Sequence, residues 1–287
     1  MKINSTTPQE QLFLQRITSV AKPPKTLYFT GVLPTHTEAP VIAIVGTRKP
    51  TAYGKEVAYT FAYELAQKGA VIVSGLALGI DGIAHRAALD AGGTTVAVLA
   101  NGLDKIYPST HAQLGARIIE NKGAIISEYE AGIAPYPSQF LSRNRIISGL
   151  SQAILIVEAA ARSGTLNTAM HALEQGREVF VIPGNITSPL SAGCNALIKQ
   201  GAHPAITPQD ILDVIAPQSI TTKPQQLTLG DTPEEQAILR LLQSGIRDGE
   251  ELQQKSKLQI SIFNQTMTML EIKGFIRALG ANNWAAK

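Results

Sequence analysis

The sequence has one cysteine, Cys194, and no long apolar run. A single cysteine excludes an intramolecular disulfide and a cysteine-rich zinc site. No run approaches the roughly 20 apolar residues that a membrane helix needs. The first ten residues are mostly polar and lack the apolar core of a signal peptide. We therefore expect a soluble, cytoplasmic protein with no membrane partner.

Charged and aromatic residues are also scarce, at 16% and 5% of the 287 residues. With 44% hydrophobic residues the chain can bury a core, so disorder is not expected. The net charge of +3 is only weak evidence for a nucleic-acid partner. Residues 41–200 hold 13 Lys or Arg and 11 Asp or Glu. Any anion site must therefore come from local clustering of basic side chains.

Several catalytic motifs are missing. The chain has no G-x-x-x-x-G-K-[ST] loop, no G-x-G-x-x-G after its first strand, and no G-x-S-x-G elbow. Asp81 and His85 stand four residues apart, which fits a helix N-cap and a packed histidine better than a metal or acid–base pair. Cys194 has no evident histidine partner and fits a packing role. We expect no catalytic residue, no bound metal and no cofactor.

Buried-strand patterns alternate with helical ones through the middle of the chain. β-branched runs separated by amphipathic stretches are typical of a parallel sheet covered on both faces, so we predict an α/β, doubly wound, mostly parallel sheet. A (β/α)8 barrel is the alternative, but it needs eight units and only six are clear. The predicted strands are residues 41–45, 71–73, 96–99, 125–127, 154–157 and 179–182. The predicted helices are 55–68, 82–91, 109–121 and 165–175. The glycines predicted to end helices are Gly69, Gly92, Gly123 and Gly176.

The two ends of the chain do not follow this alternation. Residues 1–40 are expected to form a short N-terminal extension, with a short helix at 9–18 and a short strand at 27–29. The stretch 216–230 is rich in Pro, Gln, Thr and Ser and predicts a linker between the 41–215 domain and the tail. The tail, residues 231–287, is predicted to hold three helices: one at 233–243, one capped by Asp248, and one at 260–272. A hairpin is predicted to follow them. Three helices and a hairpin are typical of a winged helix.

Ligands of open parallel sheets bind beyond the carboxyl ends of the strands, where this sequence places five glycine-bearing loops. Backbone N–H groups in such loops attract anions. Arg143, Asn144 and Arg145 stand together before the fifth strand, and guanidinium groups bind phosphate bidentately. With Arg48, Arg162 and Lys199 expected on the same rim, these residues predict a phosphate-binding site.

A series of short blocks in this region resembles the DNA-processing protein A family (DprA, also called Smf). The resemblance covers about residues 25–215 and is specific as a set. In one departure, Leu141 replaces a proline of the family's F-P-x-R-N-R block. The matching blocks are Val45–Arg48, Ser74–Ala77 with Gly79–Asp81, Gly102–Asp104 with Tyr107 and Pro108, Arg143–Ser151, Val157–Ala159, Ser163–Leu166, Pro183 with Gly184, and Gly193–Asn195.

The resemblance implies an extended Rossmann-like domain that forms a homodimer and binds single-stranded DNA. It further implies a non-enzymatic role: protecting incoming DNA in natural transformation and helping to load a RecA-type recombinase. A helical N-terminal domain common in the family is missing or vestigial in residues 1–40. The DNA contacts implied are the Gly46-Thr47-Arg48 loop, Arg143, Asn144, Arg145, the Ser163-Gly164-Thr165 turn and Lys199.

Two other functions remain open. A nucleotide sensor or phosphoribohydrolase-like enzyme could use a related fold, but those enzymes carry a glutamate three residues after the turn threonine, where this chain has Thr168. A transcription regulator would use the winged helix to bind duplex DNA. Residues 231–287 hold seven basic and seven acidic residues, so the tail lacks the positive charge that duplex binding favours.

Overall fold

The computed structural model describes residues 2–35, 38–216, 232–280 and 282–286. The chain forms two compact units, Met1–Ile220 and Thr221–Lys287. The predicted linker lies almost wholly outside the described residues. Each unit is described by itself below.

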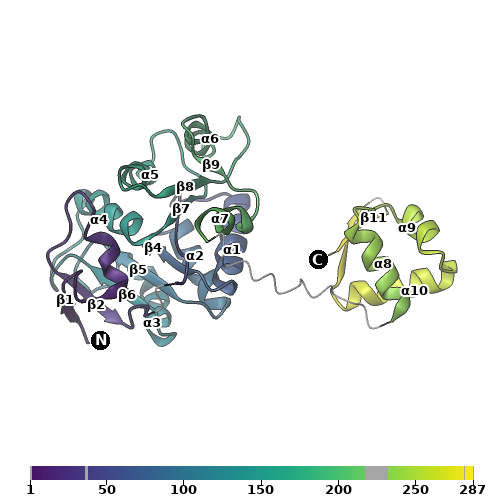
Figure 1. Cartoon of the computed structure of the whole chain (residues 1–287), viewed down its shortest axis with the longest axis horizontal. Helices are drawn as coiled ribbons and strands as arrows, with labels where there is room; N and C mark the ends of the chain where they lie inside the picture. The colour runs from purple at the N-terminus through teal and green to yellow at the C-terminus, as the bar shows by residue number, and fades with distance from the viewer. Residues whose placement is uncertain (1, 36–37, 217–231, 281, 287) are drawn as a thin grey trace. The chain divides into compact units, whose positions relative to one another are not determined.

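The larger unit is built on a nine-stranded sheet in the order β1-β2-β6-β5-β4-β3-β7-β8-β9 (Figure 1). From β6 to β9 along this order all neighbours pair in parallel. The sheet is open, which excludes the barrel alternative and confirms the doubly wound prediction. The strands are β1 (Asn4–Thr6), β2 (Leu27–Gly31), β3 (Val41–Val45), β4 (Val71–Ser74), β5 (Thr95–Leu99), β6 (Ala124–Ser127), β7 (Ala153–Ile156), β8 (Glu178–Val181) and β9 (His203–Pro204).

Helices cover both faces of this sheet because the central strands bury side chains on both sides. On one face Leu14, Ile146, Ala169 and Cys194 pack on Val73 and its neighbours. On the other, the helices after β3 and β4 pack on Ile42 and Ile44. The helices are η1 (Leu12–Ile17), α1 (Ala52–Gln67), α2 (Ile80–Asp90), η2 (Ser109–His111), α3 (Ala112–Glu120), α4 (Pro137–Leu150), α5 (Thr165–Glu174), α6 (Ala192–Lys199) and α7 (Pro208–Ile215).

The N-terminal 40 residues differ from the expected separate extension. β1 and β2 pair antiparallel with each other, and β2 pairs antiparallel with β6, so they extend the sheet at one edge. The 3-10 helix η1 packs on α4, and its Leu14 and Ile17 are fully buried. The sequence does not predict that these elements join the sheet. Their strands are short and antiparallel, so they do not follow the strand–helix alternation of the rest of the domain.

Three of the four predicted helix-ending glycines adopt the left-handed conformation, with φ of 85° at Gly69, 69° at Gly92 and 63° at Gly176. At the fourth site Lys122 takes it instead, with φ of 60°. Gly123 is needed for close approach: a Cβ there would lie 2.4 Å from the Thr95 carbonyl oxygen. The glycine therefore serves strand packing rather than helix termination.

The smaller unit has the three helices and hairpin that the tail predicts. They are α8 (Pro233–Gln243), α9 (Gly249–Ser256), α10 (Ile260–Ile272), β10 (Ile276–Gly280) and β11 (Asn283–Ala286). Asp248 caps α9 by accepting from the backbone N–H groups of Glu250 and Glu251. Ile238, Leu252, Phe263 and Leu270 belong to a core confined to this unit. The winged-helix prediction is confirmed.

Candidate nucleic-acid interface

A cavity of about 380 Å³ opens where β3, β4 and β7 end. The chain leaves β3 toward β4 on one side, and later returns to place β7 on its other side. Ligands of open α/β sheets bind at such a reversal of strand order. The cavity volume lies within the range of about 300–1,000 Å³ typical of small-ligand sites. It therefore suits a short piece of a polymer rather than a long groove.

Nine of the eleven predicted binding residues line this cavity. They come from the loop after β3, the crossover helix α4, and the turn after β7 that begins α5. Sequence reasoning missed the apolar part of the wall, notably Phe140, Leu141 and Ala160, and the polar Thr168. The nine are Gly46, Thr47, Arg48, Arg143, Asn144, Arg162, Ser163, Gly164 and Thr165.

Glu158 holds the loop after β3 in place. Its carboxylate accepts hydrogen bonds from the Thr51 backbone N–H at 2.9 Å and from the Thr51 hydroxyl. Its carbonyl accepts from the Thr47 N–H at 2.9 Å. Glu158 is 5% exposed and has a left-handed φ of 56°, a conformation that costs a non-glycine residue about 1–2 kcal/mol. Glu158 therefore anchors the loop after β3.

Arg143 forms part of the cavity wall and is 5% exposed. Its Nη1 donates to the carbonyls of Gly75, at 2.9 Å, and Val98. Burial lowers the Arg143 pKa to about 10, although Asp81 nearby opposes this, so the group stays charged at neutral pH. Arg143 therefore supplies a fixed positive charge and ties α4 to the ends of β4 and β5.

Asp81 also contributes to the wall and lies beside Arg143. Asp81 is the second residue of α2. The N-cap position predicted for Asp81 is occupied by Gly79 instead. Its carboxylate accepts from the N–H groups of Gly75, at 3.1 Å, and Ala77, at 3.4 Å. Burial raises the Asp81 pKa, while Arg143 and these two N–H groups oppose the rise. Asp81 thus braces the loop after β4 and partly balances Arg143.

Two cationic side chains on the rim stay available to a ligand. Arg48 and Arg162 are exposed, and neither makes an ion pair within the part of the chain that the structure describes. Arg48 instead lies over the Phe140 ring, 5.3 Å from its centroid. Since their N–H donors are not used up internally, both guanidinium groups can reach an anion.

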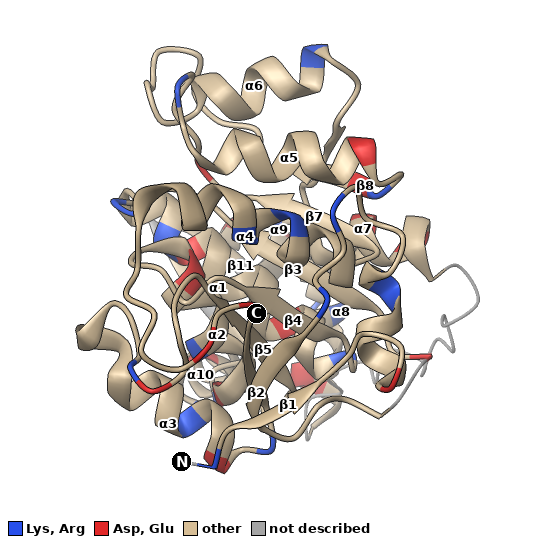
Figure 2. Ribbon diagram, turned by 90° about the vertical axis from the view of Figure 1, so that its left-hand side faces the viewer, with Lys and Arg blue, Asp and Glu red and all other residues tan. Residues whose placement is uncertain are grey.

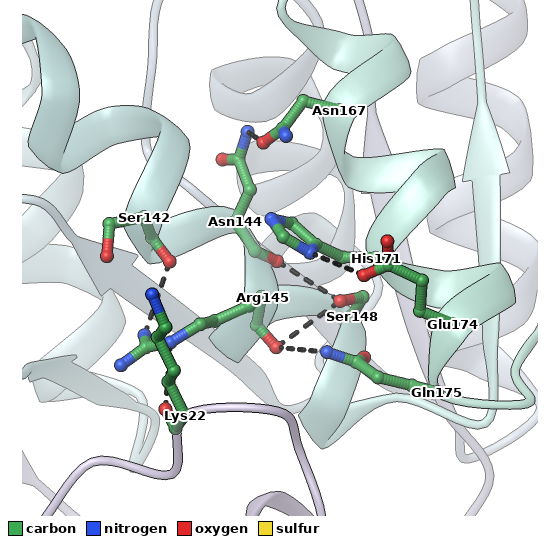
Figure 3. A network of polar contacts seen from close by, with 9 residues as sticks. All are labelled: Lys22, Ser142, Asn144, Arg145, Ser148, Asn167, His171, Glu174 and Gln175. Atoms are coloured by element: carbon green, nitrogen blue, oxygen red, sulfur yellow. Dashed lines mark hydrogen bonds and ion pairs between the residues drawn. The ribbon is translucent and has the colours of Figure 1, made fainter.

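The R-N-R block divides between the cavity and the interior. Asn144 points toward α5, where its Nδ2 donates to Asn167 Oδ1 at 3.3 Å, while Arg145 points away toward the N-terminal segment (Figure 3). Arg145 donates to the carbonyls of Lys22, at 2.9 Å, and Ser142, at 3.2 Å, and pairs with Glu128 at 2.6 Å. All its nitrogens are engaged, so Arg145 acts as an internal tie.

Helical spacing explains this division. Phe140, Arg143, Asn144 and Ile147 all line the cavity and stand at i, i+3, i+4 and i+7 of α4. Residues with this spacing share one helix face, whereas Arg145 falls outside it. The same spacing in the sequence could have identified Phe140 as part of the site.

Arg145 and Lys199 are the two predicted binding residues that do not line the cavity. Arg145 is turned inward by its ties to the N-terminal segment. Lys199 is the last residue of α6, exposed at that helix's carboxyl end. The DNA contact that the family resemblance implies for Lys199 stays a prediction.

Groups suited to catalysis are few among the residues that the structure describes. They contain no cluster of three or more His, Cys, Asp or Glu that could hold a metal. Thr168 lines the cavity where a phosphoribohydrolase would carry glutamate. Cys194 is buried, and burial raises its pKa to about 11. His85 is buried against Thr95, with 2.7 Å between Nδ1 and Oγ1.

Figure 2 marks the charged residues on the ribbon in one view. Basic and acidic residues are interspersed in the view of Figure 2. No helix in the described ranges has the length and apolarity that crossing a membrane would require. Arg48, Arg143 and Arg162, which line the cavity, form the local cluster of basic side chains that the charge count requires of an anion site.

Comparison with known proteins agrees with this architecture. A family model for DNA recombination-mediator protein A matches residues 4–216, and one for the DprA winged helix domain matches residues 222–282. Protein Smf of Escherichia coli is 51% identical over 172 residues, which cover 60% of this chain and 46% of that protein, so the match spans about half of its length.

Two solved structures are similar to the larger part of the chain. DprA from Streptococcus pneumoniae superposes with a TM-score of 0.68 at 35% identity, covering 75% of each chain. DNA processing protein A from Helicobacter pylori, in a structure concerned with its single-stranded DNA binding mode, gives 0.65 at 34% identity and covers 74% of this chain and 95% of that one. The chain belongs to the DNA recombination-mediator protein A (DprA/Smf) family, with a Rossmann-like domain and a DprA winged helix domain.

Proposed function

We propose that this protein binds single-stranded DNA through the cavity at the ends of β3, β4 and β7. The observation that carries the proposal is the pair of exposed guanidinium groups, Arg48 and Arg162, above the fixed charge of Arg143. Guanidinium groups suit phosphate oxygens. The Helicobacter pylori relative, whose structure concerns single-stranded DNA binding, supports DNA as the phosphate source.

The glycine-bearing loops complete such a site. Ser163 and Gly164 precede α5, and Thr165 begins it, so the N-terminal end of this helix lies at the cavity wall. Helix N-termini favour anions. The Thr165 hydroxyl donates to the Gly46 carbonyl at 3.1 Å and so joins the two loops. A phosphate bound here would lie near the N-terminus of α5 as well as near the guanidinium groups.

The proposed role is non-enzymatic. The one carboxylate in the cavity wall, Asp81, is engaged by two backbone N–H groups and lies beside Arg143, which leaves it poorly suited to act as a general base. Release of free base from a nucleotide mixture by the purified protein would instead favour the phosphoribohydrolase alternative.

We further propose that the protein acts as a homodimer, protects incoming DNA in natural transformation, and hands that DNA to a RecA-type recombinase. Family membership supports these roles. Exposed apolar side chains such as Met170 and Leu173 on α5 also give the larger unit surface suited to protein partners. Light scattering of the free protein tests the dimer, and recombinase filament formation on DNA coated with a single-strand-binding protein tests the transfer.

The decisive experiment compares Arg48→Ala with Lys49→Ala. Both residues are exposed neighbours in one loop, but only Arg48 lines the cavity. Charge-assisted hydrogen bonds contribute about 1.5–3 kcal/mol, so Arg48→Ala should weaken oligo-dT binding about tenfold or more. Lys49→Ala should bind like the unchanged protein. Equal affinities of the two variants in a mobility-shift titration would refute the assignment of the cavity.

A further inference from the structure

Tyr107 lies next to the cavity without belonging to its lining. Its ring is 5.8 Å from the Phe140 ring, centroid to centroid, at an interplanar angle of 55°. Phe140 lines the cavity and carries Arg48 over its ring. Arg48, Phe140 and Tyr107 therefore form a continuous row that leads from the cavity to the surface. Tyr107 is 45% exposed.

The loop that carries Tyr107 is held firmly. Asn101 Nδ2 donates to the carbonyls of Gly102, at 2.8 Å, and Lys105, at 2.7 Å. Asp104 accepts from the Gly132 N–H at 2.7 Å, which fixes this loop to the one before α4. Ile106 packs against the core cluster beneath α3. A ring mounted in this way loses little conformational freedom when a ligand covers it.

We propose that Tyr107 is a stacking platform for an unpaired nucleobase, next to the nucleotide whose phosphate occupies the cavity. This inference rests on the proposed function of the cavity. Aromatic side chains stack on bases of any sequence, because every base has a π face. The neighbouring exposed Lys105 adds a positive charge on the same loop, which suits the phosphate that follows the stacked base.

The platform would add a selectivity that the arginines cannot supply. Phosphate contacts position a strand but are equally available on duplex DNA. A base inside a duplex is already stacked and paired, so Tyr107 can engage only an unpaired one. The row from Arg48 to Tyr107 thus combines a phosphate contact with a contact that favours single strands.

The test measures two ligands against four tyrosine variants of the whole chain. The ligands are a fluorescein-labelled oligo-dT and a labelled abasic oligomer of the same length, which keeps the phosphates but has no bases. The variants are Tyr107→Ala, Tyr107→Leu, Tyr107→Phe and, as control, Tyr59→Ala. Tyr59 is 39% exposed, similar to Tyr107, but it lies on α1 and its ring stacks on Tyr63.

Tyr107→Ala should weaken oligo-dT binding about tenfold, within the range of base–aromatic stacking. It should leave abasic binding unchanged. Tyr107→Phe and Tyr59→Ala should bind both ligands like the unchanged protein. Tyr107→Leu keeps an apolar contact with Phe140 but has no π system, so it should behave like Tyr107→Ala and separates stacking from loop packing.

Two results would overturn the platform: unchanged oligo-dT affinity in Tyr107→Ala, or an equal loss on both ligands. Arg48→Ala, measured in parallel, tells this failure from a failure of the proposed function. If Arg48→Ala weakens binding to both ligands while Tyr107→Ala has no base-dependent effect, the cavity is supported as the DNA site and Tyr107 is refuted as a stacking platform. If Arg48→Ala changes neither, the cavity itself is misassigned.

Discussion

Arg143 occupies the space that a side chain on Gly75 would need. A Cβ on Gly75 would lie 2.5 Å from Arg143 Nη1, and that nitrogen donates to the Gly75 carbonyl at 2.9 Å. The guanidinium group thus lies flat against the backbone at the end of β4. This contact fixes the rotation of α4 and, with it, the helix face that lines the cavity.

Gly75→Ala should therefore impair both stability and binding. The added methyl group must displace a buried guanidinium, and overpacking of this kind costs about 1–3 kcal/mol. We expect a lower free energy of unfolding and weaker oligo-dT binding at a temperature where the variant is folded. The double variant Gly75→Ala/Arg143→Ala supplies the control. With the guanidinium gone the alanine has room, so the two changes should be strongly non-additive. Additive effects would show that the two residues do not compete for space.

Arg145→Ala should act on stability far more than on affinity. The substitution removes the hydrogen bonds to the Lys22 and Ser142 carbonyls and the ion pair with the half-buried Glu128 carboxylate. Losing one partner of such a network costs about 2–4 kcal/mol. Arg162→Ala, on the exposed rim, should show the opposite pattern. Chemical unfolding and oligo-dT titration of both variants check this. A large affinity loss in folded Arg145→Ala would mean that Arg145 reaches the DNA after all.

His85 should make the larger unit less stable in mild acid. Burial lowers its pKa to about 3, whereas a histidine in the unfolded chain titrates near 6.5. Between these values the unfolded chain binds a proton that the folded one does not, so stability falls as pH falls below about 6.5. The loss approaches about 1.4 kcal/mol per pH unit.

The comparison with His85→Gln isolates this effect. Between pH 7 and pH 5 the unchanged protein should lose about 2 kcal/mol more than the variant, because glutamine does not titrate. Circular dichroism in urea follows the unfolding, while the fluorescence of Trp284, the single tryptophan, marks the separate transition of the winged helix. Parallel pH profiles for the two proteins would contradict a neutral buried His85.

Cys194 should resist thiol reagents in the folded protein. Its side chain is fully buried, and burial raises its pKa to about 11. The reactive thiolate is then about a hundredfold rarer than in a thiol of ordinary pKa near 9. Labelling with an aromatic disulfide at pH 8 should be slow and should accelerate in urea. Labelling in seconds without denaturant would show that the thiol is accessible.

The sequence predicted the central fold well because buried parallel strands have a strong local pattern. Residues 41–45 are a predicted strand and form β3 without change, and the other central strands agree to within a residue at each end. The predicted strand at 27–29 lies within β2. The sequence missed β1, an edge strand whose antiparallel pairing with β2 is decided at long range, and the short helices α6 and α7.

The candidate site was predictable as a location but not in the orientation of every side chain. The rule that ligands bind at the strand ends brought three loops together correctly. The sequence places three polar residues in a row on α4 but does not say which of them face the cavity. That depends on the rotation of the helix, which two contacts fix together: Arg143 with Gly75, and Arg145 with Lys22, more than a hundred residues away in the chain.

The salt dependence of binding counts the phosphates that each cavity neutralises. Three guanidinium groups border it, those of Arg48, Arg143 and Arg162. For single strands the slope of log K against log salt is about −0.7 per phosphate, so two to three contacts predict a slope of about −2 for an oligomer too short to reach a second cavity. Arg48→Ala and Arg162→Ala should each make the slope shallower by about 0.7, while Lys49→Ala should leave it unchanged. A slope steeper than about −4 would instead require an extended basic groove.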